Sequence, residues 1–306
     1  MDTDLIIQEI RSSVEAVAIQ VPWRTVAPDY EGSERDSRVP GDTGFDIAGV
    51  REWEPGLKLD YLLTARTGWR EKLSIEWEQP RQLTVQVFVK ESPSIDYGVV
   101  KQNKARLAAA LVAWVLTGAS ALSDLAGYGI WSEKGVKRFS RPRSAAKQIY
   151  PLLEAYVENG EVDEPCENGA AALYSLVERL PTNRKCLVFV ISDSLSAEEM
   201  NALDAASGHD VVVLAVGDLR ERELPPGRGF REIQDINTGK TITVLLNEDT
   251  RQKWRAAFDK QRSDLRSGLD ELGMSMEEFF THEDEPEFKE KLLPILGGHR
   301  PRGTEG

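Results

Sequence analysis

The sequence predicts an α/β protein whose core is a doubly wound, mostly parallel sheet. Near-continuous apolar segments of strand length recur along the chain, as in LTVQVFV (residues 83–89), KCLVFVIS (185–192) and HDVVVLAVG (209–217). Segments of helical length and pattern separate them. Strands that alternate with helices in this way form a parallel sheet that is covered on both faces.

Before residue 83 the pattern is different. Residues 4–18 carry apolar side chains at helical spacing and predict a first helix. Residues 22–43 contain prolines and glycines and predict an irregular connection. Residues 45–80 alternate and are rich in tryptophan and tyrosine, which predicts short strands and turns. We therefore expect a helix and a small β-rich element over residues 1–80, in which Trp53, Tyr61 and Trp69 are packing residues.

The main α/β domain is expected over residues 81–300, with a flexible tail at 297–306. Its further strands are predicted at 125–131, with a hairpin partner at 134–139, and at 240–246. Helices are predicted at 107–120, 144–158, 169–180, 197–205, 250–272 and 286–296. The apolar run at 105–122 approaches membrane-spanning length. It contains Arg106 and many small residues, so we interpret it as a buried helix rather than a membrane insertion.

Composition excludes several classes of function. The chain of 306 residues has 38 Lys and Arg against 51 Asp and Glu, a net charge of −13. This balance argues against nucleic-acid binding, which needs a basic surface. The two cysteines, Cys166 and Cys186, form neither a metal-binding pair nor a disulfide framework, so a reducing cytoplasm is the expected location. The amino terminus is acidic and amphipathic, unlike a signal peptide.

Polar side chains follow two of the predicted strands. Ser92 and Ser94 come after residues 83–89, and Asp193 comes after residues 185–192. Ligands of open α/β sheets bind beyond the carboxyl ends of the strands, so these side chains converge if the two strands are neighbours. Two hydroxyls and a carboxylate suit Mg²⁺ or Mn²⁺. The alternative is that each residue only caps a helix or forms a turn.

Other catalytic patterns are absent from the sequence. The three histidines, His209, His282 and His299, lie in separate segments. The sequence contains no nucleophile elbow, no phosphate-binding lysine loop and no dinucleotide-binding glycine motif. Cys186 begins an apolar strand and is interpreted as a core residue. We therefore expect no enzymatic activity and no catalytic residue.

Several segments taken together resemble the bacterial and archaeal family called domain of unknown function 58. These segments are REWEPG (51–56), LDYLLTARTG (59–68), the strand that runs into KESPSID, LVFVISDSL, and HDVVVLAVGDLRERELP followed by the turn DINTGK. The matching residues in the first two are Arg51, Glu52, Trp53, Pro55 and Gly56, then Asp60, Tyr61, Ala65, Arg66, Thr67 and Gly68. The resemblance covers roughly residues 40–295.

The resemblance implies a fold, a site and a partner. The family is similar to von Willebrand factor A domains, so it implies a doubly wound, Rossmann-like domain with a metal-ion-dependent adhesion site. Its members are often encoded beside MoxR-type AAA+ ATPases, which implies protein partners and chaperone-like remodelling. In such a site Ser92 and Ser94 take the serine positions and Asp193 takes the third-loop position. The second-loop segment PCENGAAAL offers Glu167 or Asn168 but no threonine.

The first aspartate of that site is replaced by Lys90. An ammonium repels a divalent cation, so we expect a degenerate site that holds neither Mg²⁺ nor Mn²⁺ and needs no cofactor. The lysine is expected to fill the place of the cation and to pair with Asp193 or Glu167. Lys90, Glu91, Glu167 and Asp193 are the candidate partner-binding residues.

These observations favour a non-enzymatic protein-binding adaptor that works with a MoxR-type AAA+ ATPase on other proteins. Two alternatives stay open. One is a metal-dependent hydrolase built on Ser92, Ser94 and Asp193, which would need a bound metal and a general base. The other is a scaffold in which the degenerate site is only structural.

Overall fold

The computed structural model describes residues 38–39, 46–53, 61–78, 83–96, 103–121, 124–157, 161–182, 185–237, 239–283, 287–288 and 290–292. The chain divides into a small unit, residues 28–82, and a large unit formed by residues 1–27 and 83–306. The predicted helix at 4–18 and the predicted tail at 297–306 lie outside the described residues. The predicted domain bounds therefore stay a proposal.

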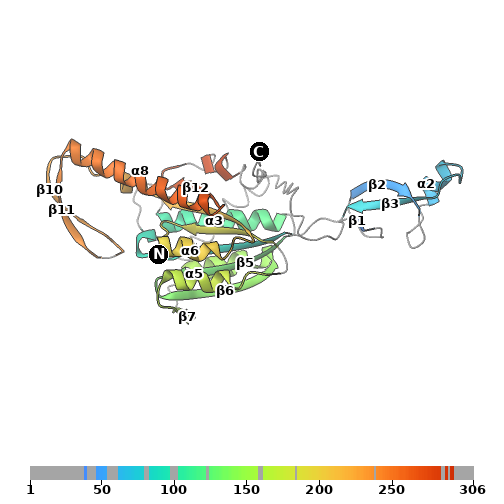
Figure 1. The fold of residues 1–306 in the computed structure, drawn as a ribbon, viewed down its shortest axis with the longest axis horizontal. Coiled ribbons are helices and arrows are strands. Elements are labelled where there is room, and N and C mark those ends of the chain that lie inside the picture. Colours follow the sequence, from blue (N-terminus) through green and yellow to red (C-terminus); the bar gives the residue numbers. More distant parts are fainter. Residues whose placement is uncertain are drawn as a thin grey trace. The chain divides into compact units, whose positions relative to one another are not determined.

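A seven-stranded sheet forms the centre of the large unit (Figure 1). Its strands lie in the order β12–β9–β8–β4–β5–β6–β7. Their bounds are β4 (Thr84–Lys90), β5 (Leu125–Ser132), β6 (Gly135–Ser144), β7 (Glu164–Pro165), β8 (Leu187–Ser192), β9 (Asp210–Gly217) and β12 (Ser275–Phe280). The five strands from β12 to β5 are parallel to one another. Strand β6 is antiparallel to β5, and β7 is antiparallel to β6. The prediction of a mostly parallel sheet is confirmed.

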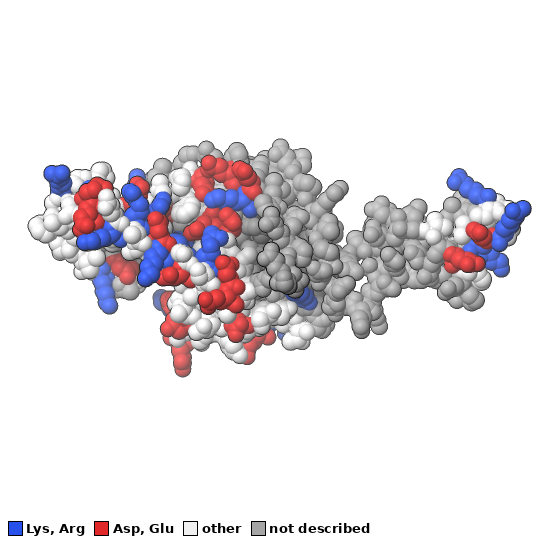
Figure 2. Space-filling view, turned by 45° about the horizontal axis from the view of Figure 1, so that its top comes forward, with Lys and Arg blue, Asp and Glu red and all other residues white. Residues whose placement is uncertain are grey.

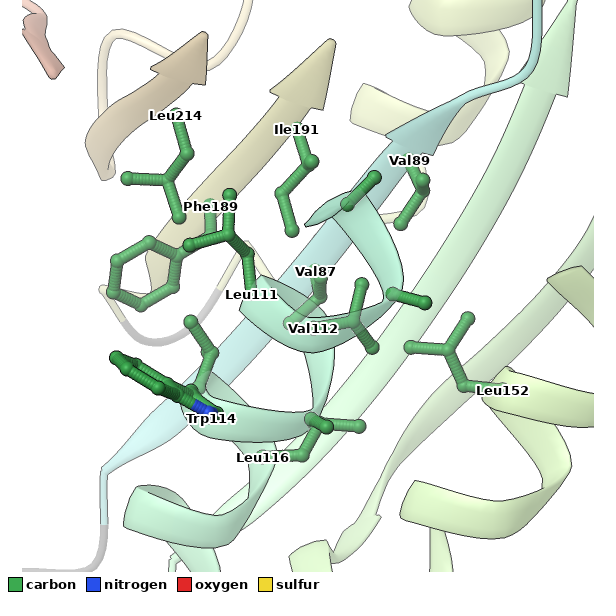
Figure 3. Packing of buried hydrophobic residues seen from close by; sticks show 14 of the residues in the cluster. Val87, Val89, Leu111, Val112, Trp114, Leu116, Leu152, Phe189, Ile191 and Leu214 are labelled. Atoms are coloured by element: carbon green, nitrogen blue, oxygen red, sulfur yellow. The ribbon is translucent and has the colours of Figure 1, made fainter. Parts of the chain in front are cut away.

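Helices cover both faces of this sheet. They are α3 (Lys104–Ala121), α4 (Ile149–Val157), α5 (Gly169–Val177), α6 (Ala197–Asp204) and the end of α8 (Glu248–Glu271). The short helix α7 (Leu219–Arg222) buries no residue. Side chains alternate along β4, so Val87 and Val89 pack with α3 and α4, whereas Phe88 packs in a second cluster with α5 and α6. Figure 3 shows the first cluster, in which Leu111 and Val112 of α3 lie against the sheet. No helix among the described residues is long and apolar enough to span a membrane.

Three strands of the large unit were not predicted: the two-residue strand β7 and the longer strands β10 (Gly229–Gln234) and β12. β12 carries adjacent glutamates, Glu277 and Glu278, and β10 carries Arg231 next to Glu232. These charged residues interrupt the apolar run from which a strand is predicted. Strands β10 and β12 lie at sheet edges, where charged side chains reach solvent and discourage further pairing.

Two bounds also differ from the prediction. The helix expected from residue 144 begins at Ile149, because Ser144 is the last residue of β6 and residues 145–147 form a short 3₁₀ helix. Residues 38–39, expected to be irregular, form the short strand β1 (Arg38–Val39).

The small unit contains a three-stranded antiparallel sheet in the order β1–β3–β2, from β2 (Asp46–Glu52) and β3 (Leu73–Glu78). The expectation of strands and turns alone was wrong for LDYLLTARTG, which contains the helix α2 (Tyr61–Arg66). Thr64 of this helix is buried and accepts a hydrogen bond from the backbone N–H of Leu73 at 3.0 Å. Trp69 was expected to pack inside, but it is 58% exposed.

At the amino ends of β4 and β5 lies a buried carboxyl group, that of Asp124. Its Oδ1 accepts a hydrogen bond from the Leu83 backbone N–H at 2.8 Å, and its Oδ2 has no hydrogen-bond partner among the described residues. Burial raises the pKa of Asp124 to about 6 from an ordinary value of 3.8, although the Leu83 hydrogen bond lowers it. The folded chain therefore holds this proton more tightly than the unfolded chain does.

Stability should consequently fall with rising pH through this group. Its contribution is fully present below pH 3.8 and is lost as the pH rises through about 6. The total is about 3 kcal/mol, of which roughly 1.5 kcal/mol falls between about pH 5 and about pH 7.5. Urea unfolding at several pH values should show Asp124→Asn gaining stability relative to the wild type over this range. An Asp124→Asn difference that does not change with pH would contradict the assignment.

Candidate functional site

The carboxyl ends of β4 and β8 are neighbours and bring the predicted hydroxyls and carboxylate together. Ser92 Oγ donates to Asp193 Oδ1 at 3.0 Å, and Ser94 Oγ donates to Asp193 Oδ2. The two serine oxygens lie 3.1 Å apart. The strand order reverses on the two sides of β4, since β5 lies on one side and β8 on the other. This is the position at which open α/β sheets hold ligands.

A lysine that was not expected from the sequence completes this group. Lys104 is the first residue of α3, and its side chain is 1% exposed. Its Nζ lies 2.9 Å from Asp193 Oδ2 and 2.5 Å from Glu221 Oε1 of α7. We call Ser92, Ser94, Lys104, Asp193 and Glu221 the strand-end cluster. Within it, Lys104 supplies the positive charge that balances the buried Asp193.

Opposing effects set the pKa of Asp193. Burial by itself raises the pKa of this carboxyl group. The Lys104 ammonium and the hydrogen bonds from Ser94, Lys104 and Ser92 oppose that effect and hold the pKa below its ordinary value. Because the pKa is lowered on folding, the stabilisation is present above the ordinary value of 3.8 and is lost only as the pH falls through the folded value.

Lys90 does not pair with Asp193 or Glu167, so that expectation was wrong. Its Nζ donates to Glu199 Oε2 of α6 at 2.7 Å and lies 3.4 Å from Glu133 Oε1. Lys90 is two residues after Phe88 and therefore points to the same face of the sheet, which α6 covers. Asp193 lies instead beside Lys104.

The carboxylate that receives Lys90 is itself fully buried. The Glu199 side chain is 1% exposed, and it accepts hydrogen bonds from Trp131 Nε1 at 3.0 Å and from the Ser196 backbone N–H at 2.9 Å. The Ser196 hydroxyl in turn accepts from the Glu199 N–H, which completes a capping box at the start of α6. Lys90 is thus tied to the amino end of that helix.

The remaining candidate residues lie apart from this pair. Glu91 is bound by Lys137, whose Nζ lies 2.8 Å from Glu91 Oε1. Glu167 is exposed, and Asn168 caps α5 by accepting from the Ala171 N–H at 2.8 Å. The structure therefore brings Ser92, Ser94 and Asp193 together and leaves Glu91 and Glu167 outside the strand-end cluster.

The donor set does not fit the divalent cation that the resemblance implies. Both carboxylate oxygens of Asp193 already accept from serine hydroxyls, and Oδ2 also receives the Lys104 ammonium. A second ammonium, Lys90, ends the strand that leads into the serines. Across the described part of the chain, no group of three or more His, Cys, Asp or Glu side chains is arranged to hold a metal.

We therefore expect no micromolar binding of Mg²⁺ or Mn²⁺, because Lys104 would have to leave Asp193 before a cation could bind. Isothermal titration of the purified chain with each ion measures this directly. Micromolar binding that disappears in both Asp193→Ala and the milder Ser94→Ala variant would contradict the expectation.

The expectation that the histidines stand apart from this site agrees with two of their positions. His209 Nδ1 accepts from the Cys186 N–H at 3.1 Å at the amino end of β8, the opposite end from Asp193. His282 packs against Phe280, with ring centroids 5.8 Å apart, after β12. Neither places a general base beside Ser92 or Ser94.

The sequence did contain a signal for Lys104. It opens a helix that has no acidic residue in its first turn, and a cation is unfavourable at a helix amino terminus. A buried lysine there needs carboxylates from elsewhere in the fold, which are Asp193 and Glu221. The identity of these partners depends on the order of the strands, so the local sequence alone does not give it.

A family model described as "Protein of unknown function DUF58" matches residues 49–264. No curated protein matches the chain. Among solved structures, the chain is similar to the conserved hypothetical protein BatB from Bacteroides thetaiotaomicron, with 15% identity, 70% of this chain and 97% of that chain covered, and a TM-score of 0.42.

Two further structures are similar over parts of their length. The pilus adhesin SpaC from Lactobacillus rhamnosus GG has 9% identity, 44% of this chain and 25% of that chain covered, and a TM-score of 0.33. The PilB minor pilin from Streptococcus sanguinis has 8% identity, 74% and 66% covered, and a TM-score of 0.36.

Proposed function

Because the chain belongs to the DUF58 family, whose model matches more than half of it, we propose that it is a non-enzymatic, protein-binding adaptor of the von Willebrand A-like type. In this proposal it works in the cytoplasm with a MoxR-type AAA+ ATPase in the remodelling or maturation of other proteins. The resemblance to the family supplies the partner class. Neither Cys166 nor Cys186 is part of a disulfide, which suits a reducing compartment.

The observation that carries the non-enzymatic proposal is the internal neutralisation of the strand-end cluster and of the neighbouring Lys90–Glu199 pair. Asp193 is satisfied by Ser92, Ser94 and Lys104, and Glu199 is satisfied by Lys90, Trp131 and the start of α6. A hydrolase built on these residues would need a free metal position and a general base. The residues present favour a pre-organised surface over a reaction centre.

The charge distribution supports a protein partner over a nucleic acid. On the face shown in Figure 2, acidic and basic side chains of the described residues are interspersed and do not gather into a basic patch. The net charge of the chain is −13. Interspersed charge of both signs is what a specific protein partner can match, and it does not provide a continuous phosphate-binding surface.

Co-purification tests the proposed partner. The tagged chain is used to retain the purified MoxR-type AAA+ ATPase encoded in the same genome, with ATP, with ADP and without nucleotide. We expect retention that depends on nucleotide. Retention of none of the ATPase in all three states would overturn the partner assignment.

A matched pair of variants locates the contact. Glu167→Lys changes an exposed candidate that follows β7, and Glu271→Lys makes the same change at an exposed position at the end of α8. If the partner docks over the carboxyl ends of the strands, Glu167→Lys should weaken retention and Glu271→Lys should not. Equal retention by both variants would exclude Glu167 from the contact.

A further inference from the structure

The hairpin β10–β11 forms a sheet of its own, separate from the seven-stranded sheet (Figure 1). Within the described part of the chain, strand β11 (Thr241–Leu246) pairs antiparallel with β10 only, and it then leads into α8. Four of the nine large hydrophobic side chains that are exposed among the described residues belong to this hairpin: Phe230, Ile236, Ile242 and Leu245. A two-stranded sheet with exposed apolar side chains is marginal by itself, which indicates that another segment covers it.

The two edges of the hairpin differ in charge. β10 carries Arg231 and Glu232, which discourage pairing with a further strand. β11 has the sequence TITVLL, with no charged residue, no proline and no glycine, and its β-branched residues favour a strand. It therefore lacks the usual protection of an exposed edge.

The turn of the hairpin determines which backbone groups of β11 face outward. The Gly239 N–H donates to Asp235 O at 2.7 Å and the Asp235 N–H donates to Lys240 O at 2.8 Å, with Gly239 at φ +69°, the arrangement of a β-bulge. Asp235 and Lys240 thus form a hydrogen-bonded pair. Alternation along an antiparallel ladder then turns the N–H and C=O groups of Thr241, Thr243 and Leu245 away from β10.

We propose that β11 pairs with β11 of a second copy of this chain, forming a continuous sheet β10–β11–β11–β10 about a two-fold axis at Thr243. With the two-fold axis perpendicular to the sheet, the two β11 strands are antiparallel, and residues directly opposite each other point to the same face of the sheet. Thr243 of one copy then lies opposite Thr243 of the other. Ile242 then lies opposite Val244 of the second copy, and Thr241 lies opposite Leu245. All of the outward-facing groups of β11 named above obtain partners in this register.

The same register also covers exposed apolar side chains and keeps like charges apart. Ile242, which is 52% exposed, would lie between Val244 of the second copy and its own partner Ile233. No charged side chain of one β11 faces a charge of the other, which matters because each chain carries a net charge of −13. The two copies of Glu232 are separated by both copies of Thr243, so repulsion between them is weak.

Sedimentation velocity on the purified chain alone tests this proposal. The wild type should show a monomer–dimer equilibrium between about 1 μM and about 1 mM, because a single strand pair is smaller than a standard interface. Thr243→Pro removes an outward-facing N–H and leaves the hydrogen bonds to β10 in place, so it should be monomeric throughout. Glu232→Pro makes the same change on the partner residue in β10 and should dimerise like the wild type.

A second variant covers the case in which proline disturbs the hairpin. Thr243→Lys keeps the N–H and places two ammonium groups together on the axis, so it should also be monomeric, with an unchanged circular dichroism spectrum. A monomeric wild type, or a Thr243→Lys variant that dimerises like the wild type, overturns the proposal. A monomeric wild type whose Thr243→Pro variant loses the ATPase would assign the edge to a strand of that partner instead. The sedimentation measurements on the chain alone need no ATPase, so their failure is distinct from failure of the proposed function.

Discussion

Replacing Lys104 by methionine should lower the free energy of unfolding of the large unit by about 3–5 kcal/mol. The methionine fills a similar volume but leaves the Asp193 carboxylate, with a side chain 2% exposed, without its cation. The hydroxyls of Ser92 and Ser94 remain as donors, but neither carries charge. The loss is measured by urea unfolding at neutral pH, and we expect the pKa of Asp193 to rise in the variant.

Two controls distinguish the buried charge from simple loss of packing. Glu221→Gln removes the partner of Lys104 that is 27% exposed, and it should cost less than about 1 kcal/mol. The double variant Lys104→Met with Asp193→Asn removes both buried charges and should recover much of the loss. A double variant as unstable as Lys104→Met alone would show that packing, and not the unpaired carboxylate, causes the effect.

A loss of similar size, about 3–5 kcal/mol, is expected for Lys90→Met. Glu199 would keep the Trp131 and Ser196 hydrogen bonds but would lose its only charged partner among the described residues. Because Glu199 also caps α6, we expect amide hydrogen exchange in Ala197–Asp204 to accelerate together with the fall in unfolding free energy.

Removing the charge of the other member of this ion pair, Glu199, should lower the unfolding free energy less. In Glu199→Gln, Lys90 still has the exposed Glu133 carboxylate at 3.4 Å and the Ser194 carbonyl oxygen at 3.3 Å. The Lys90 ammonium therefore keeps a counter-charge, that of Glu133, whose side chain is 63% exposed and hydrated. If Glu199→Gln lowers the unfolding free energy more than Lys90→Met does, the assumption that the Glu199 carboxylate depends on Lys90 more than Lys90 depends on Glu199 is wrong.

The sequence predicted the sheet because burial on both faces requires continuous apolar strands. The segments at 84–90, 187–192 and 210–217 have the length of strands and are rich in β-branched apolar residues, which favours strands over helices. The edge strands β10 and β12 were missed, since charged side chains at an edge interrupt the apolar pattern. α2 was missed because Tyr61 and its neighbours fit a strand pattern as well as a short helix.

The site was predictable in part. The meeting of Ser92, Ser94 and Asp193 follows from their positions directly after strands, once those strands are neighbours. The pairing of Lys90 was predicted wrongly, although the two-residue period of β4 already assigns it to the face of Phe88. Lys104 lies 89 residues from Asp193 along the chain, and only the tertiary fold brings the two together.

Both lysines of this edge lie inside the protein, with side chains 5% and 1% exposed. Dissolved counter-ions cannot approach charges that water does not reach, so ionic strength should hardly change these two ion pairs. The exposed pair between Arg222 and Asp259, at 2.8 Å, should weaken as salt is added. These two buried ion pairs should therefore hold the carboxyl edge of the sheet in the same arrangement in dilute and in concentrated salt.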